Sequence, residues 1–86
     1  SVLGDDLMNN NLKFKSLDDL YRRLLPALRA KTTELKTLGY KYIYEEDIWN
    51  YLKNHKWMKD HNLDLGIMVN DIFNLNNKDI DKYVRN

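Results

Sequence analysis

A run of apolar residues between positions 17 and 38 constrains the fold of this chain more than any other feature. Its members recur at spacings near three and four, which places them on one stripe of an α-helix; they are Leu17, Tyr21, Leu24, Leu28, Leu35 and Leu38. Only Lys31 and Thr32 interrupt the pattern. A helix with one apolar stripe buries that stripe against other elements, so we expect a bundle of packed helices.

The two ends of this helix carry residues that helix termini prefer. Ser16 can cap the first turn, and Asp18 and Asp19 follow it near the positive end of the helix dipole. Gly39 comes directly after the last leucine, as a C-cap glycine does. Pro26 removes one backbone hydrogen bond inside the pattern, so either the helix kinks there or two helices meet. Because Pro26 lies opposite the apolar stripe, we favour a kink that bends the helix around its core.

The next segments predict an extended connector, a second helix and a loop. Residues 40–44 alternate as a strand does, but without a partner strand we expect an extended connector. Three consecutive acids at positions 45–47 suit the start of a helix, whose inward side chains would be Ile48, Trp49 and Leu52. This helix should end near Asn54, before a polar loop over residues 54–62 that Trp57 pins to the core.

Two further helices complete the prediction. The first covers about residues 63–74 with a stripe of Leu65, Met68, Val69 and Ile72. Gly66 inside it costs about 1 kcal/mol relative to alanine, and close approach of another helix is one explanation. The second is a short helix capped by Asn76 or Asn77.

The fold class that follows is all-α: a small single-domain bundle of four or five helices. The length of 86 residues allows one domain, which we place at residues 16–86. Residues 1–15 form an N-terminal arm that is either a short helix over about residues 5–9 or a loose segment docked by its apolar side chains.

Composition excludes several classes of protein. There is no cysteine, so neither a disulfide framework nor a thiolate metal site is expected. No stretch approaches the roughly 18 apolar residues of a membrane span, and the first residues lack the pattern of a secretory signal, which predicts a cytoplasmic protein. The net charge of +1 argues against a generic polyanion binder. Positive charge nevertheless concentrates in residues 13–41 and negative charge in residues 60–81, so the molecule should be an electric dipole.

The sequence offers little for catalysis or metal binding. His55 and His61 are six residues apart across a predicted loop, whereas zinc ligands commonly pair at i and i+4 on a helix. The acids at 45–47 are explained by helix electrostatics. No serine or cysteine nucleophile has a recognisable partner, and no glycine-rich phosphate loop is present. We therefore expect no enzyme, no metal and no cofactor.

A cluster of aromatic residues supplies the main candidate for function. Six of the ten aromatics lie between positions 40 and 57, with lysines among them. Such residues can build a core, or they can stack on RNA bases beside cations that hold phosphate. We expect Trp49 in the core and Tyr42 to be the aromatic most exposed to solvent. Trp57 could be either a core residue or part of a binding surface. The candidate RNA- or partner-binding residues here are Tyr40, Lys41, Tyr42, Lys53, Lys56, Trp57 and Lys59.

A second candidate surface is the basic face of the first helix. Lys15, Arg22, Arg29 and Lys36 recur every seven residues away from the apolar stripe. This face could follow a phosphate backbone, or it could simply be solvated. Exposed aromatics and arginines are also enriched at protein interfaces, so a protein partner stays an open alternative.

Four short motifs resemble one known family. They are Leu38-Gly39-Tyr40, Glu46-Asp47-Ile48-Trp49, Lys56-Trp57 and Val69-Asn70-Asp71-Ile72. With them, residues 20–84 resemble the post-transcriptional regulator family of low-GC Gram-positive bacteria, which includes a competence regulator. The chain departs from the family pattern at Tyr44, where a small capping hydroxyl residue is expected.

The resemblance implies control of gene expression after transcription, through the leader of a messenger RNA. It also implies a tie to the division-site and cell-pole protein DivIVA, and it supplies no catalytic residues. We therefore predict a non-enzymatic regulator that binds RNA or an RNA-handling complex. The alternative is a protein-interaction adaptor at the cell pole or division site that binds a coiled-coil partner of the DivIVA type and does not touch RNA.

Overall fold

The described part of the protein is built from helices. A computed structural model describes residues 17–60 and 62–86, and within these ranges there is no β-strand. The elements are α2 (Leu17–Thr37), α3 (Glu45–His55), the 3₁₀ turn η1 (Trp57–Lys59), α4 (Leu65–Phe73) and α5 (Asn77–Arg85). The all-α prediction is confirmed. The expectations for residues 1–15, Ser16 and His61 lie outside the described residues.

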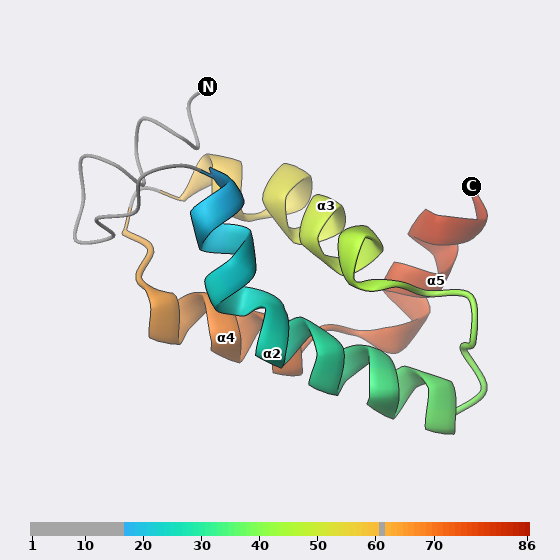
Figure 1. The fold of residues 1–86 in the computed structure, drawn as a ribbon. Coiled ribbons are helices and arrows are strands. Elements are labelled where there is room, and N and C mark those ends of the chain that lie inside the picture. The colour runs from blue at the N-terminus through green and yellow to red at the C-terminus, as the bar shows by residue number, and fades with distance from the viewer. Residues whose placement is uncertain (1–16, 61) are drawn as a thin grey trace.

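The long first helix α2 continues through Pro26. Figure 1 shows that its axis changes direction between the blue first turns and the green turns that follow, and Pro26 is exposed on the outer side of the helix. The prediction of one kinked helix, rather than two meeting helices, is confirmed. Pro26 is tolerated because it faces water, where its ring displaces no core side chain.

The C-terminal end of α2 is closed by Gly39. This glycine has φ +104°, a value that side chains disfavour, and the amide of Tyr40 donates back to the carbonyl of Leu35 at 2.8 Å. The expected C-cap is therefore confirmed. Leu38 was expected on the buried stripe, and that expectation is wrong: Leu38 is 58% exposed because the helix ends one residue earlier and Leu38 lies in the turn.

The interruption of the stripe has a structural cause. Lys31 and Thr32 are each only 3% exposed, although both are polar. The Lys31 Nζ donates to the carbonyl of Phe73, the last residue of α4, at 3.4 Å, and it pairs with the Glu34 carboxylate at 2.8 Å. The Thr32 hydroxyl donates to the Arg29 carbonyl at 2.9 Å. Both polar groups are thus satisfied where α2 packs against α4.

The core lies between α2, α3 and α4 and is centred on the two tryptophans. The ring of Trp49 makes edge contacts with Tyr21 at 5.3 Å and with Trp57 at 5.9 Å. Around them lie the aliphatic residues of the core: Leu20, Leu24, Ala27, Leu28, Leu35, Ile43, Ile48, Leu52, Leu63, Met68, Ile72, Leu75 and Ile80. Leu20 and Ala27 widen the predicted stripe of α2.

The three shorter helices begin at caps that the sequence supplies. Tyr44 precedes α3, and its backbone amide donates to the Asp47 carboxylate at 2.8 Å. The Asp64 carboxylate accepts from the Ile67 amide at the start of α4. Asn76, one of the two predicted caps, accepts from the Lys78 and Asp79 amides at the start of α5. Each cap satisfies amides that lack an intrahelical partner.

The explanation offered for Gly66 is wrong. Gly66 is exposed, and a Cβ built there would meet only Oδ1 of Asp64, at 3.4 Å. No other helix of the described ranges approaches it closely. None of the described helices has the length and hydrophobicity needed to span a membrane.

Candidate nucleic-acid interface

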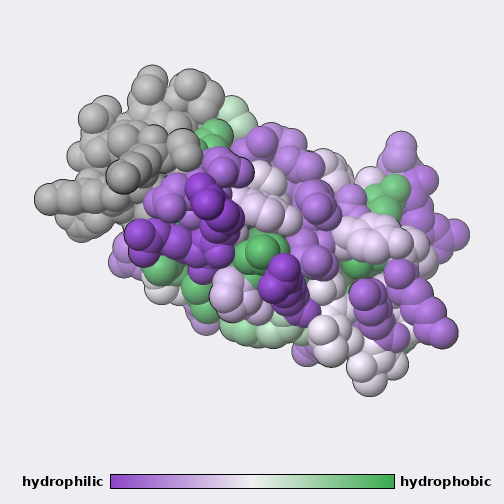
Figure 2. Space-filling model, in the orientation of Figure 1, coloured by the Kyte–Doolittle hydropathy of each residue, from purple (hydrophilic) through white to green (hydrophobic). Residues whose placement is uncertain are grey.

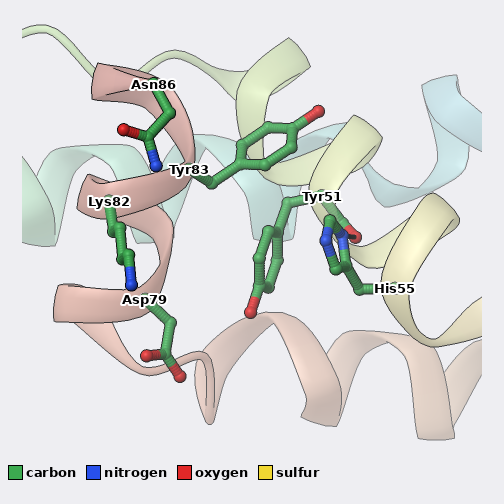
Figure 3. A pocket seen from close by; sticks show the side chains of 6 residues that line it. All are labelled: Tyr51, His55, Asp79, Lys82, Tyr83 and Asn86. Carbon is green, nitrogen blue, oxygen red and sulfur yellow. Dashed lines mark hydrogen bonds between the residues drawn. The ribbon is translucent and has the colours of Figure 1, made fainter.

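An aromatic groove lies between α3 and α5. Tyr51 and His55, one turn apart on α3, stack at a ring distance of 4.5 Å and an angle of 21°. Tyr83 from α5 meets Tyr51 at 5.2 Å and His55 at 5.5 Å, both edge to face. Figure 3 shows the three rings together with Asp79 and Lys82 of α5 and with Asn86, which follows that helix; these residues complete the lining. The groove therefore combines an aromatic floor with a polar rim.

The size and openness of the groove suit a small planar group. Its volume is about 430 Å³, within the range of sites that hold small ligands. The Nδ1 of His55 lies 3.0 Å from the Tyr51 carbonyl, which fixes the imidazole against the Tyr51 ring. The two rings are thus held in place before any ligand arrives.

The rim of the groove carries one acidic and one basic side chain, Asp79 and Lys82. Burial raises the pKa of the Tyr51 phenol, and the negative charge of Asp79 raises it further. Neither the Asp79 carboxylate nor the Lys82 ammonium has a hydrogen bond or ion pair to another residue of the described ranges. A carboxylate and an ammonium are therefore both available to an incoming molecule.

The residues predicted from the sequence do not form one surface. Tyr42 is 41% exposed, and its hydroxyl donates to the Asp81 carboxylate of α5. Lys41 beside it in the chain is exposed, whereas Tyr40 is half-buried against the core. Tyr42 faces solvent as expected, but the expectation that it is the most exposed aromatic is wrong, because Tyr44 is 56% and Phe73 is 49% exposed.

Trp57 corrects the predicted site most clearly. It is 0% exposed, so the core reading holds and its ring is closed to a base. Lys56 is tied to Asp71 by an ion pair of 2.6 Å, while Lys59 is exposed on η1. Lys53 lines a different hollow of about 390 Å³ between the start of α2 and α3, together with Leu17, Asp18, Tyr21, Glu46, Trp49 and Asn50. The predicted cluster is therefore divided among separate places.

Electrostatics distinguish that second hollow from the aromatic groove. Burial raises the pKa of the Tyr21 phenol; Glu46 and Glu45 add to the effect and Arg29 opposes it. The second hollow is lined by two carboxylates, of Asp18 and Glu46, and one ammonium, of Lys53, whereas the groove is lined by one carboxylate and one ammonium.

The basic face of α2 is present and exposed. Arg22 pairs with Asp18 at 3.2 Å, so part of its charge is compensated. Arg29 and Lys36 are exposed and have no ion-pair partner within residues 17–60 and 62–86. Figure 2, which has the orientation of Figure 1, shows a mainly hydrophilic surface in which hydrophobic areas are small and separate. The face is open to solvent along the helix.

Sequence reasoning missed the groove because its parts are distant in the chain. Tyr51 and Tyr83 are far apart in sequence and meet only when α5 packs on α3. The available signal was local: Tyr51 and His55 are four residues apart on one predicted helix, and this spacing brings side chains together. His55 was expected at the surface, and it is exposed. Among the described residues no group of His, Asp or Glu side chains is arranged to hold a metal.

A third surface lies on the outer side of α4. The exposed residues within α4 are all uncharged: Gly66, Ile67, Asn70 and Phe73. Ile67 is 39% and Phe73 is 49% exposed. Exposed apolar side chains grouped on one helix are a feature of protein-interaction surfaces.

Fold and surface together define a small all-α domain with an aromatic groove and a separate basic face. The chain belongs to the post-transcriptional regulator family, whose model matches residues 17–85. It is 36% identical over 58 residues to the post-transcriptional regulator ComN of Bacillus subtilis strain 168, an alignment that covers 66% of this chain. The chain spans 59% of the length of that relative. No solved structure matches this chain.

Proposed function

We propose that this protein regulates gene expression after transcription by binding RNA directly, without catalysing a reaction. The observation that carries the proposal is the groove between α3 and α5, where three aromatic rings lie beside the ammonium of Lys82, which has no ion-pair partner among residues 17–60 and 62–86. Proteins bind single-stranded RNA by stacking bases on aromatic rings and holding phosphates with cations. The leader of a messenger RNA is the target that we expect.

The basic face of α2 would add to affinity without adding specificity. Arg29 and Lys36 are exposed, with Lys41 beyond the end of the helix, and each can contact a phosphate. Such contacts are independent of sequence and weaken with salt. With a net charge of only +1, we expect affinity to depend on a few placed contacts rather than on a general positive field.

A salt titration tests direct contact. Binding of an unstructured RNA of about twelve nucleotides is followed by fluorescence anisotropy from about 50 to 200 mM salt. Each phosphate contact to a single strand contributes about −0.7 to the slope of log affinity against log salt. Lys82→Gln should make the slope shallower by about this amount, because Lys82 lines the groove.

Lys78→Gln is the matched control. Lys78 is an exposed lysine on the same helix and does not line the groove, so its loss changes net charge equally. We expect its slope to equal that of the unmodified protein. Failure of the unmodified protein to bind RNA at the lowest salt would overturn the proposal.

A second candidate function is that of an adaptor, and the outer side of α4 favours it. Ile67 and Phe73 are exposed on a helix face without charge, which suits the apolar face of a partner helix. The partner would be a coiled-coil division-site protein of the DivIVA type, and the protein would then gather at the pole or division site. Replacing Ile67 and Phe73 together by serine should abolish capture of such a partner and leave RNA binding unchanged.

A further inference from the structure

We infer that the groove between α3 and α5 selects a guanine base of single-stranded RNA, and that Asp79 reads the Watson–Crick edge of that base. This inference rests on the proposed function and extends it from RNA binding in general to the recognition of one base. Helix electrostatics alone would explain an acid such as Asp79 at the start of α5. The inference also makes Asp79 a determinant of specificity.

The arrangement of the rings leaves one face open for a base. His55 covers one face of Tyr51 by stacking. Figure 3 shows Lys82, Asp79 and Asn86 on the other side of the Tyr51 ring, and Tyr83 beside it. A planar base that enters from the α5 side would therefore extend the stack of His55 and Tyr51 by one member. Tyr83, which already meets Tyr51 edge to face, would border the base.

The polar groups of α5 lie where the edge of such a base and the phosphate of its nucleotide would be. Asp79, Lys82 and Tyr83 share one face of α5 at spacings of three and four residues. The backbone amide of Asp79 is satisfied by Asn76 at 3.0 Å, while its carboxylate has no partner among the described side chains. The Asp79 charge acts on the Tyr51 phenol, so the carboxylate is within electrostatic reach of the stacking ring.

The chemistry of a carboxylate decides among the four bases. An ionised carboxylate offers only acceptors. Guanine presents two adjacent donors, N1–H and the 2-amino group, and both oxygens of Asp79 can accept from them in parallel. Adenine and cytosine place an acceptor next to their single amino donor, and uracil flanks its one N–H with two carbonyl oxygens. The ammonium of Lys82 is then free to hold the phosphate.

The experiment compares two RNA probes that differ by one amino group. Each is a uridine-rich strand with a single central purine, guanosine in one and inosine in the other, which lacks the 2-amino group. For the unmodified protein we expect about tenfold tighter binding of the guanosine strand. Asp79→Asn should reduce this ratio to about one. Tyr51→Leu should weaken binding of both strands, because stacking does not depend on the amino group.

Asp81→Asn supplies the matched control. It makes the same charge change on the same helix, outside the groove lining, and should keep the tenfold ratio. Circular dichroism of each variant establishes that the fold is intact. If Asp79→Asn keeps the preference, or if the unmodified protein binds both strands equally, the inference is overturned while RNA binding stands. If neither strand binds, both proposals fail, and the outer side of α4 becomes the surface to pursue.

Discussion

The indole Nε1 of Trp57 donates a hydrogen bond to Oδ2 of Asp71 at 2.9 Å. The other oxygen of the same carboxylate pairs with Lys56 at 2.6 Å. One acidic side chain of α4, itself only 9% exposed, therefore holds two consecutive residues at the start of η1. This contact closes the turn onto α4 and allows Trp57 to enter the core with its polar atom satisfied.

The two contacts of Asp71 should differ in their contribution to stability. Trp57→Phe removes the indole donor and leaves a buried acceptor without its partner, which we expect to cost about 1–3 kcal/mol. Lys56→Met removes the counter-charge of the Asp71 carboxylate, but the lysine is half exposed and the Trp57 indole still donates to that carboxylate, so we expect a smaller loss, of about 1 kcal/mol. Urea unfolding followed by circular dichroism measures both. Equal losses would contradict the role assigned to Trp57.

Lys31 allows a second test, because its charge is buried and Glu34 compensates it. Lys31→Met retains the aliphatic volume and removes the need for compensation, so we expect a change within about 1 kcal/mol. Glu34→Gln removes the compensating charge and leaves the buried ammonium with neutral acceptors such as the Phe73 carbonyl, and we expect a loss of about 1–3 kcal/mol. Thermal unfolding of the two variants shows which one is less stable. A larger loss of stability in Lys31→Met than in Glu34→Gln would refute this account.

The two described glycines should respond to alanine in opposite directions. Gly39 has φ +104°, so Gly39→Ala should destabilise the protein by about 1–2 kcal/mol. Gly66 is exposed in α4, and an added Cβ meets only Asp64 at ordinary contact distance. Gly66→Ala should therefore stabilise by up to about 1 kcal/mol. Chemical denaturation curves give the change in the free energy of unfolding for each variant. Changes of the same sign in both variants would contradict this prediction.

Alkaline pH should destabilise the fold through its tyrosines. The hydrogen bond to Asp81 raises the pKa of Tyr42 above the ordinary value of 10.0, and burial raises the pKa of Tyr21 and Tyr51. At pH values between the pKa of the unfolded state and that of the folded state, the folded state binds more protons than the unfolded state. This contribution to stability is therefore complete below pH 10.0 and is lost as pH rises through the folded pKa.

The titration of Tyr42 isolates one of these groups. Asp81→Asn removes the charged acceptor, so the Tyr42 phenol should lose its proton at lower pH, nearer the ordinary value. Phenolate absorbance as a function of pH follows this, with Tyr42→Phe identifying the signal. An unchanged titration curve in Asp81→Asn would show that the hydrogen bond does not hold the proton.

Much of the fold was predictable because its signals are local. The stripe of α2, the acids before α3, the Asn76 cap and the Gly39 turn depend on residues close in sequence. The burial of Lys31 was not predictable, because it needs the end of α4 as a partner. Tyr44 departs from the expected small hydroxyl cap, yet α3 still begins there because Asp47 binds its amide.

The site was predicted less well than the fold, for the same physical reason. The aromatic and basic residues between 40 and 59 are close in sequence, but helix packing sends Trp57 inward, Lys53 to the α2 side and Tyr42 toward Asp81. The groove depends instead on the meeting of α3 with α5. Contacts between distant segments are what a single sequence reveals least.

Backbone amide NMR with an RNA strand that contains one guanosine tests the central claim most directly. The account predicts that titration of the RNA shifts the amide signals of Tyr51, His55, Lys82 and Tyr83, which surround the groove, and that Asp79→Asn diminishes these shifts. Signals on the outer side of α4, such as those of Ile67 and Asn70, should stay in place. A spectrum that does not change, or shifts confined to α4, would contradict direct recognition of RNA by the groove.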